Sequence, residues 1–187
     1  MTILFTIALR QEYTPPKLKN SHTIYTGIGK LNAAITLIDA IHEFRPSSVI
    51  NIGTAGSLSE SLVGEVFQVK EVIERDMLAE PLAPRGEIPF EVHKNRYFSD
   101  VGHGKCASGD SFVTKSDPWL LDNNVDVFDM ELIAIARVCN HFQIPWRSMK
   151  FVTDHVGGNS GQDWLEMLSK AQKGFDANLT QTIQDLV

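Results

Sequence analysis

The chain has 187 residues, of which 43% are hydrophobic and 21% are charged, and its formal net charge is −6. This length suits one folded domain with a substantial core, and the composition is that of an ordinary globular protein. The acidic balance, without any basic run, argues against a nucleic-acid-binding protein and against binding to an anionic membrane surface.

The two cysteines, Cys106 and Cys139, are too few for a disulfide framework and show no paired metal-ligand spacing. They predict a protein of the reducing cytoplasm. The apolar opening, residues 2–8, lacks the basic flank and cleavage site of a signal peptide, so we expect a first buried strand there. No apolar run approaches the ~20 residues that a membrane span needs.

The first third of the chain predicts a strand, a connector, a second strand and a helix. The strand over 2–8 places Glu12 just beyond its carboxyl end. Residues 13–21 contain two prolines and predict an irregular connector before a short strand over 22–26. A helix is expected over 31–44. Its apolar spacing predicts a buried face made of Leu31, Ala34, Ile35, Ile38 and Ile41.

The turn before this helix reads Gly27-Ile28-Gly29-Lys30. A Walker phosphate loop has four residues between its last two glycines and a serine or threonine after the lysine, and this turn has neither. The glycines instead favour a tight turn that lets the backbone approach a ligand.

A buried strand expected over 49–52 runs into the small-residue segment Gly53-Thr54-Ala55-Gly56-Ser57. We interpret this segment as a turn whose backbone amides and Thr54 hydroxyl suit a water molecule, a phosphate or a ribose oxygen. The glycines are equally compatible with a simple change of chain direction. A longer strand is expected over 66–73.

Residues 77–96 contain three prolines and predict a long loop, and loops of this length are usually functional or mobile. The following segment, residues 105–114, has a Ser-Gly-Asp turn before Phe112. The Phe112 ring either stacks on a planar base or belongs to the core. His103 and Cys106 have no further ligand at metal-binding spacing, so both are interpreted as structural.

The stretch Val125–Val138 changes from the alternation of a strand to the spacing of a helix at Asp129-Met130-Glu131. Both carboxylates then lie at a helix N-terminus, where free amides and the helix dipole keep them ionised. A fixed carboxylate at the carboxyl edge of a sheet is a good acceptor for the two hydroxyls of a ribose. The alternative is stabilisation of the helix dipole without any ligand.

The last third of the chain predicts a strand over 149–153 that delivers Asp154 to the same edge of the sheet. Residues 155–162 are rich in glycine and predict a mobile flap. Asp163 is expected to cap a final helix. The apolar face of that helix comprises Trp164, Leu168, Ala171, Phe175, Leu179 and Ile183.

Alternating strands and helices, without repeats or a linker, predict one α/β domain over residues 1–187 with a mainly parallel sheet. Its carboxyl edge gathers Glu12, the Asp129 and Glu131 pair, and Asp154. Cleavage of the N-glycosidic bond to a purine needs such a set. One acid protonates the departing base, one carboxylate activates water and another holds the ribose hydroxyls. Distinct surroundings give each carboxyl group the pKa that its role requires.

Five segments in a fixed order carry a resemblance to a known family. They are Gly27–Lys30, Ile50–Gly56, Ser108–Phe112, Asp129–Glu131 and Thr153–Asp154. From Gly27 to about Leu186, with a shorter match in the first twelve residues, the chain resembles the 5′-methylthioadenosine/S-adenosylhomocysteine nucleosidases of the nucleoside phosphorylase superfamily. The resemblance implies a three-layer fold with a central mixed, mainly parallel sheet flanked by helices. It also implies a homodimer that acts on a small nucleoside without a cofactor or metal.

The resemblance implies a role for individual side chains. Asp154 would be the general acid that protonates the purine, Glu131 would bind the ribose diol, and Glu12 would activate a water molecule that Thr54 helps to hold. Other implied contacts are Met130 at the sugar, Phe112 and the Val113 backbone at the base, Ala55 and Gly56 in the glycine-rich segment, and Leu9, Ile28 and Trp164 around the 5′-alkylthio group. The 77–96 loop lies where a partner subunit closes that pocket.

Two departures separate this chain from the family pattern. The segment between Glu12 and Gly27 is shorter than usual, as if a strand hairpin were missing, and Ile7 stands where glycine is usual. They leave open another 5′-group, such as that of futalosine or aminodeoxyfutalosine. A phosphorylase would place arginines at the glycine turns. Asn51 occupies one such position and Arg10 is the remaining candidate, which favours hydrolysis. A third alternative, a non-catalytic nucleoside-binding protein, would have no need of Asp154.

Overall fold

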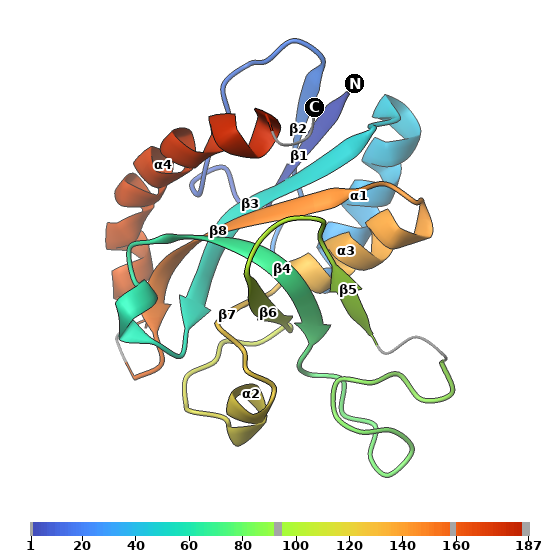
Figure 1. Cartoon of the computed structure of the whole chain (residues 1–187), viewed down its shortest axis with the longest axis vertical. Helices are drawn as coiled ribbons and strands as arrows, with labels where there is room; N and C mark the ends of the chain where they lie inside the picture. Colours follow the sequence, from blue (N-terminus) through green and yellow to red (C-terminus); the bar gives the residue numbers. More distant parts are fainter. Residues whose placement is uncertain (1, 92–94, 158–159, 185–187) are drawn as a thin grey trace.

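The computed structural model describes residues 2–91, 95–157 and 160–184, with the side chains of the last helix described from Met167 onward. The elements follow one another as β1 (Ile3–Ile7), β2 (Ser21–Tyr25), α1 (Lys30–Phe44), β3 (Ser48–Ser57), a 3-10 turn (Glu60–Leu62), β4 (Val66–Glu74), β5 (Arg96–Phe98), β6 (Gly104–Ser108), α2 (Pro118–Asp122), β7 (Val127–Asp129), α3 (Leu132–His141), β8 (Trp146–His155) and α4 (Ser160–Gln184). Figure 1 shows their arrangement.

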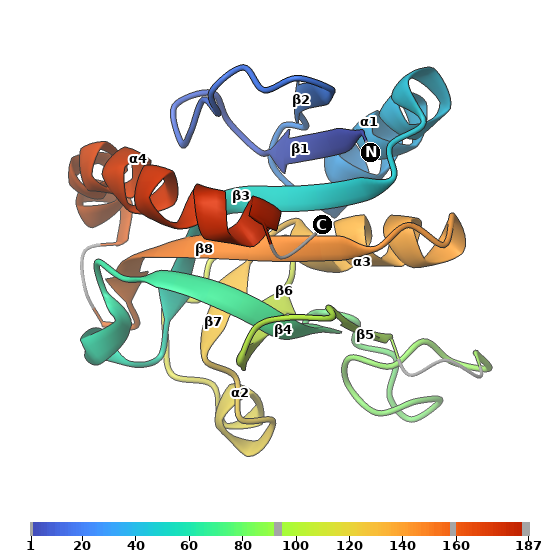
Figure 2. The same ribbon diagram turned by 45° about the horizontal axis from the view of Figure 1, so that its top comes forward.

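The sheet closes on itself. From its edge it runs β2, β1, β3, and then β3 pairs with β8, β8 with β4, β4 with β6, β6 with β7, and β7 again with β3. The short strand β5 adds to β4. Most of these pairings are parallel, and those of β3 with β7, β4 with β5 and β4 with β8 are antiparallel. The predicted mixed, mainly parallel sheet is therefore confirmed. In Figure 2, β3 and β8 run side by side through its centre.

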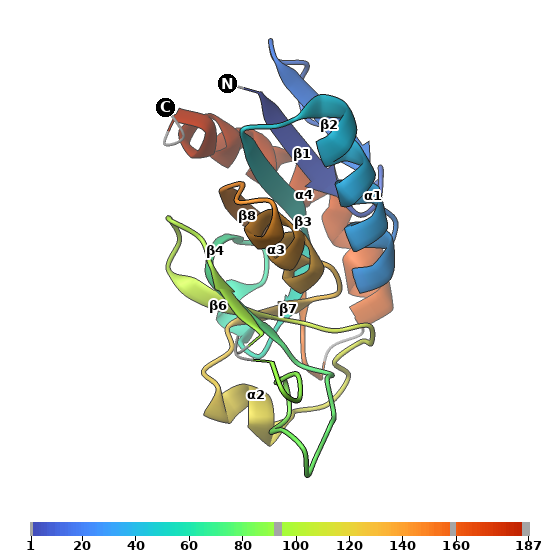
Figure 3. The ribbon, with the colours of Figure 1, turned by 90° about the vertical axis from the view of Figure 1, so that its right-hand side faces the viewer.

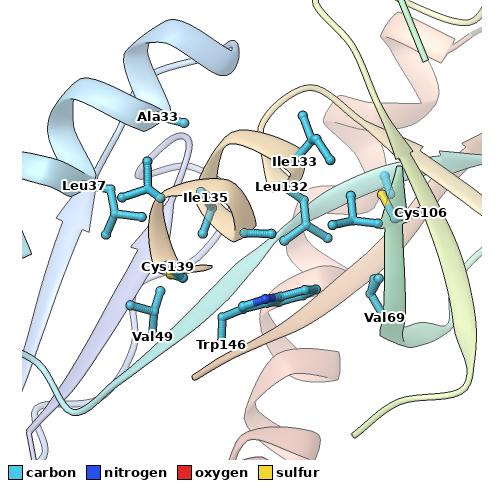
Figure 4. Close-up of a cluster of buried hydrophobic side chains, with 14 of the residues drawn as sticks. Ala33, Leu37, Val49, Val69, Cys106, Leu132, Ile133, Ile135, Cys139 and Trp146 are labelled. Atoms are coloured by element: carbon cyan, nitrogen blue, oxygen red, sulfur yellow. The ribbon is translucent and has the colours of Figure 1, made fainter. Parts of the chain in front are cut away.

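Helices cover both faces of this sheet, which confirms the three-layer prediction (Figures 1 and 3). On one face α1 and α3 pack on the strands. Their shared core, drawn in Figure 4, includes Ala33, Leu37, Leu132, Ile135, Cys139 and Trp146. On the other face α4 packs through Ala171, Phe175 and Leu179 on residues of β1, β3 and β8. Strands buried on both faces explain the continuous apolar runs in the sequence.

The strand β3 is longer than the sequence predicts, and the expected turn over Gly53–Ser57 is wrong. These residues continue the ladder with β8, up to the pair of Ser57 with His155. Small residues are needed here for close packing. A Cβ atom at Gly56 would overlap the ring of Phe128. Gly56 therefore leaves room for the Phe128 ring, and the segment does not reverse the chain.

The buried face predicted for α1 is only partly correct, because Ile41 is buried and Ala34 packs against the core, but the other three predicted residues are exposed. Its fully buried residues are Ala33, Leu37, Ala40 and Ile41, whereas Leu31, Ile35 and Ile38 are exposed. At 100° per residue these three lie on the opposite side of the helix. We call Leu31, Ile35 and Ile38 the α1 stripe. The helix thus has two apolar faces, and periodicity alone does not tell which one meets the sheet.

The shortened segment after β1 is anchored below α4. Tyr13 is fully buried, its ring lies 5.1 Å from that of Phe175, and its hydroxyl donates to Asp176 at 2.8 Å. The connection between the parallel strands β1 and β2 therefore needs no hairpin to hold Glu12 in place. At the other end of the chain, α4 begins at Ser160, before the predicted cap Asp163. No helix in the described segments is long and apolar enough to cross a membrane.

Candidate active site

A cavity of about 210 Å³ opens where the strands of the closed sheet end. All predicted site residues line it except Trp164, whose side chain lies outside the described residues. Three of them come from the parallel strands β1, β3 and β8: Glu12 follows β1, Thr54 lies late in β3 and Asp154 lies near the end of β8. The prediction that carboxyl groups from distant parts of the chain meet at one sheet edge is confirmed.

Glu12 is fixed by three hydrogen bonds. Its Oε1 accepts from the amide and from the hydroxyl of Thr54, at 3.0 and 2.7 Å, and its Oε2 accepts from the Leu9 amide at 3.0 Å. The side chain is 5% exposed and borders the cavity. With the shortened connector and with Ile7 in place, the Glu12 carboxyl group is therefore held at the wall of the cavity.

Asp154 reaches the cavity because β8 is bulged. Ala55 pairs with Val152 and Gly56 pairs with Asp154, so Thr153 is an extra residue in the ladder. In an unbroken ladder Asp154 would pair with Ser57 and point to the other face of the sheet. With the bulge, both Thr153 and Asp154 border the cavity, and the Thr153 hydroxyl donates to Asp154 Oδ1 at 2.8 Å.

Asp129 is a buried carboxylate paired with a buried lysine. Its Oδ2 lies 2.6 Å from Nζ of Lys150, and the two side chains are 1% and 2% exposed. Asp129 also accepts from the Ser108 hydroxyl at 2.5 Å and from the Leu132 amide at 3.1 Å. Burial raises the pKa of Asp129, but the charge of Lys150 and these hydrogen bonds outweigh it, so the net pKa lies below its ordinary value.

Glu131 has the opposite electrostatic setting. Burial, reinforced by the charge of Asp129, raises the pKa of Glu131 to about 7, against the opposing effects of Lys150 and the Gly29 amide. That amide donates to Glu131 Oε1 at 2.8 Å. The lowered pKa of Asp129 agrees with the expectation that carboxylates at this helix N-terminus stay ionised, whereas the raised pKa of Glu131 runs against it. A short distance in sequence does not imply a shared pKa.

The turn before α1 serves the site through its backbone and not as a phosphate loop. Gly27 and Gly29 have positive φ angles, which glycine adopts without strain. Nζ of Lys30 lies 2.9 Å from Glu74 and 2.5 Å from Asp76, so its ammonium group is already paired with two carboxylates. The Lys30 amide donates to Asp110 at 2.8 Å. The turn therefore links Glu131 to the loop after β6.

That loop carries Phe112 and Val113 to the mouth of the cavity. Phe112 is 78% exposed, which excludes the core interpretation of its ring and leaves it available to a flat ligand. Leu9 and Ile28 also border the cavity and supply apolar surface, and Ile28 is half exposed. The lining of the cavity therefore combines an aromatic ring, several carboxyl groups and apolar side chains. His103, whose ring packs on Phe67, lies elsewhere.

Sequence reasoning missed several residues that border the cavity: Ala8, Arg75, Ser111 and Phe128. It also missed Lys150, the ion-pair partner of Asp129. The available signal was a charged residue inside an otherwise apolar strand for Lys150, and an arginine directly after an apolar strand for Arg75. Both patterns indicate a buried charge that needs an interaction partner, but neither pattern identifies that partner.

Comparison with known proteins places this geometry among nucleoside-cleaving enzymes. The family model described as "Phosphorylase superfamily" matches residues 17–186. The 5′-methylthioadenosine/S-adenosylhomocysteine nucleosidase of Staphylococcus haemolyticus is 30% identical over 195 residues, covering 91% of this chain and 85% of the relative.

Solved structures show the same fold. The 5′-methylthioadenosine/S-adenosylhomocysteine nucleosidase of Helicobacter pylori, solved with butyl-thio-DADMe-Immucillin-A, has a TM-score of 0.84 at 20% identity, covering 100% of this chain and 98% of that one. A native structure named futalosine hydrolase, from Helicobacter pylori strain 26695, gives the same TM-score, identity and coverage. At such identity these likenesses establish the fold, and the 5′-group is a separate question.

Proposed function

Because this chain belongs to the phosphorylase superfamily, and within it to the 5′-methylthioadenosine/S-adenosylhomocysteine nucleosidase family, we propose that it hydrolyses the N-glycosidic bond of a 5′-substituted adenosine. The products are adenine and a free ribose derivative. The observation that carries this proposal is one cavity bordered by the carboxyl groups of Glu12, Glu131 and Asp154. Hydrolysis of a nucleoside needs an acid for the base, an acceptor for the diol and a base for water.

Asp154 is the proposed general acid. It donates a proton to N7 of the purine while the bond from the sugar to N9 breaks, which makes the base a better leaving group. The Thr153 hydroxyl, bonded to Asp154 Oδ1, fixes the carboxyl group beside the cavity. Phe112 stacks on the purine, and the backbone of Val113 binds the edge of the ring. The exposure of Phe112 and the position of Val113 at the cavity support this placement.

Glu131 and Glu12 take the sugar and the water molecule. Glu131 accepts hydrogen bonds from the ribose diol, and Met130 packs on the sugar. Glu12 removes a proton from water as it attacks C1′ of the ribosyl cation. The bonds from Thr54 and Leu9 support this role, because they hold the Glu12 carboxylate in one orientation. Ala55 and Gly56 complete the wall beside the sugar.

Water is favoured over phosphate as the nucleophile by the positions of the basic residues. Arg10 is exposed, and its guanidinium lies 4.1 Å from the centre of the Tyr25 ring. Asn51, at the position where a phosphorylase would place an arginine, is buried and donates to the Thr6 carbonyl at 3.1 Å. Arg75 is the only arginine among the described residues that line the cavity, and it donates to backbone oxygens.

The apolar end of the cavity takes the 5′-alkylthio group between Leu9 and Ile28, with Trp164 as a further proposed contact. The protein acts as a homodimer whose second subunit covers this end. Two exposed apolar surfaces support the dimer: the α1 stripe, beginning one turn after Ile28, and the loop between β4 and β5, where Leu78, Leu82 and Phe90 are exposed. Isolated monomers rarely expose so many large apolar side chains together.

The cytoplasm is the proposed location. Cys106 and Cys139 are both free and buried. Burial raises the pKa of the Cys139 thiol to about 12 and that of the Cys106 thiol well above its usual range, so both remain thiols. Two unpaired cysteines in the core suit a reducing compartment.

One assay tests the reaction and its nucleophile. Purified protein is incubated with methylthioadenosine, with and without phosphate, and the base and sugar products are identified. We expect adenine and free methylthioribose in both conditions. Phosphate-dependent release of a sugar phosphate would replace the hydrolase with a phosphorylase. Because the same fold also occurs in a protein named futalosine hydrolase, futalosine and aminodeoxyfutalosine are included as substrates.

The variant Asp154→Asn tests the proposed acid. General acid catalysis contributes roughly 10²- to 10⁴-fold, so turnover should fall by at least about 10²-fold while methylthioadenosine still binds. Asp122→Asn is the matched control, because Asp122 is exposed on α2 and does not line the cavity. Full turnover by the Asp154→Asn protein would exclude the acid role.

A further inference from the structure

Arg75 lies directly after β4, is 4% exposed and borders the cavity without belonging to the chemistry proposed above. Its guanidinium donates to the loop after β6. Nη2 bonds the carbonyl of Gly109 at 2.8 Å and also the carbonyl of Ser111, and Nη1 bonds the hydroxyl of Ser111 at 3.0 Å. Three acceptors of this loop, on Gly109 and Ser111, are therefore satisfied by one side chain.

Burying the charge of Arg75 at this position costs free energy. No carboxylate oxygen of the described residues forms an ion pair with it, and its Nε has no hydrogen-bond partner among them. Burial lowers the pKa of the guanidinium, against the opposing effects of the charges of Asp76, Asp129 and Glu74. Buried charges without a paired counter-ion are rare, because desolvation is expensive. The arrangement calls for a function beyond stability.

The loop after β6 packs directly on Arg75 and Asp76. A Cβ atom at Gly109 would come within 2.8 Å of Asp76 Cγ and 2.9 Å of Arg75 Cγ. The Asp110 amide donates to Asp76 Oδ2 at 2.6 Å, and the Arg75 amide donates to the Ser108 carbonyl at 2.9 Å. The glycine of the Ser-Gly-Asp motif is thus required by close contact with Arg75 and Asp76. The next residues along this loop are Phe112 and Val113.

We propose that Arg75 is a positioning residue for the base end of the cavity, acting through Gly109 and Ser111 to hold Phe112 and Val113 where they meet the purine. This inference rests on the proposed nucleosidase function. Its direct effect is at the base end, because Glu131 and Glu12 take their hydrogen bonds from Gly29, Thr54 and Leu9, none of which is bonded to the guanidinium. The loop reaches Glu131 only indirectly, through Asp110, which accepts from the Lys30 amide beside Gly29.

The planar guanidinium is the feature that the loop requires. Its fixed fork of donors bonds two carbonyls and a hydroxyl at once, whereas a lysine offers a single nitrogen on a flexible stem. A lysine at this position would keep the charge but not the geometry. We therefore expect Arg75→Lys to weaken adenine binding as Arg75→Met does. If only the charge of Arg75 mattered, the lysine variant would bind adenine like the wild type.

The experiment measures two fragments of the substrate separately. Adenine probes the base end and methylthioribose probes the sugar end, in wild type, Arg75→Met and Arg75→Lys. We expect adenine to bind at least about tenfold more weakly in both variants, since hydrogen bonds from a charged donor are lost, while methylthioribose affinity stays within about twofold. KM for the nucleoside should rise more than kcat falls. Hydrogen exchange of the 109–113 amides should accelerate, and exchange in α4 should not.

Two controls separate positioning from general loosening. Arg147→Met removes another buried guanidinium, which lies away from the cavity and pairs with Asp100 at a distance of 2.8 Å. This variant should leave adenine binding unchanged. Ser111→Ala removes one bond from the loop and folds readily because Ser111 is exposed. It should weaken adenine binding by about threefold in wild type and have no further effect in Arg75→Met, as expected for coupled residues.

Several outcomes would overturn the inference. Adenine affinity within about twofold of wild type in Arg75→Met would remove the role, and equal weakening of both fragments would reduce it to general stability. If the wild type cleaves methylthioadenosine and all Arg75 variants match it, the positioning role is refuted and the proposed function stands. A wild-type protein that neither cleaves nucleosides nor binds adenine refutes the proposed function and this inference together.

Discussion

Asp129 and Glu131 stand two residues apart at the start of α3, yet the pKa values of their carboxyl groups are shifted in opposite directions. Lys150 pairs with Asp129 at 2.6 Å and lowers its pKa, whereas burial raises the pKa of Glu131 to about 7. The sequence predicts that both lie at the helix N-terminus, which is correct. It does not predict the difference, because Lys150 follows Asp129 by 21 positions and reaches it only through the pairing of the closed sheet.

The raised pKa of Glu131 makes stability depend on pH. Its pKa is 4.5 in an unfolded chain and about 7 in the folded protein. Between these values the folded state binds more protons than the unfolded state, so the contribution of Glu131 to stability falls as pH rises through this window. Glu131→Gln cannot ionise and should escape this cost. The variant should gain on the order of 1–3 kcal/mol over wild type at pH 8 and almost nothing at pH 4.5.

Urea unfolding of wild type and Glu131→Gln at a series of pH values measures this difference directly. The stability gap should open between pH 4.5 and 7 and stay constant above. Nucleoside binding is measured in parallel and should be weak in the variant, since an amide is a poorer acceptor for a diol than a carboxylate. A gap that does not change with pH would mean that Glu131 ionises normally in the folded protein.

At the scale of elements, α1 has an apolar face on each side. The face that packs on the sheet contains Leu37 and Ala40, and the α1 stripe lies on the other side. The sequence predicts the helix almost to its ends but assigns the stripe to the buried face, because the larger side chains of the stripe dominate the periodicity. Similarly, β3 extends through glycines that in sequence favour a turn, since the flanking strands and Phe128 determine their use.

The α1 stripe predicts the effect of charge on the proposed dimer. Leu31→Glu combined with Ile35→Glu would place two carboxylates in an apolar interface and should convert the dimer to a monomer. Sedimentation equilibrium measures the mass. Activity toward methylthioadenosine should fall with it, because the second subunit is proposed to cover the 5′ end. Glu43→Lys, on the same helix but outside the stripe, is the control and should remain dimeric. A monomeric wild type would remove the dimer proposal.

At the scale of the whole molecule, the closed ring of strands creates the site. It brings together β3, β4, β6, β7 and β8, which come from the middle and the end of the chain, and we infer one folding unit over residues 1–187. The sequence predicts the three-layer fold and most of the residues that line the cavity, because these residues lie in short motifs that follow strands in a recognisable order. It does not predict the ring closure, and therefore misses Arg75, whose partners lie on a loop of another strand.

The ion pair between Lys150 of β8 and Asp129 of β7 spans the interior of this ring. Lys150→Met removes the ammonium and leaves a buried carboxylate unpaired, which should cost about 3–5 kcal/mol of unfolding free energy. Lys173→Met, an exposed change on α4, should cost less than about 0.5 kcal/mol. Denaturant unfolding measures both. Equal stability of the two variants would show that the ion pair makes no net contribution to stability.

Because of the bulge at Thr153, the direction of the Asp154 side chain depends more on the number of residues in β8 than on which residues they are. A chain that kept every side chain of the cavity but paired β8 regularly with β3 would fold into the same layers and direct Asp154 away from the cavity. Under the acid role proposed for Asp154, such a protein would look intact by circular dichroism and be inactive. Substitutions along β8 are therefore a gradual route to altered activity, whereas a shift of pairing by one position at Thr153 is an all-or-none loss.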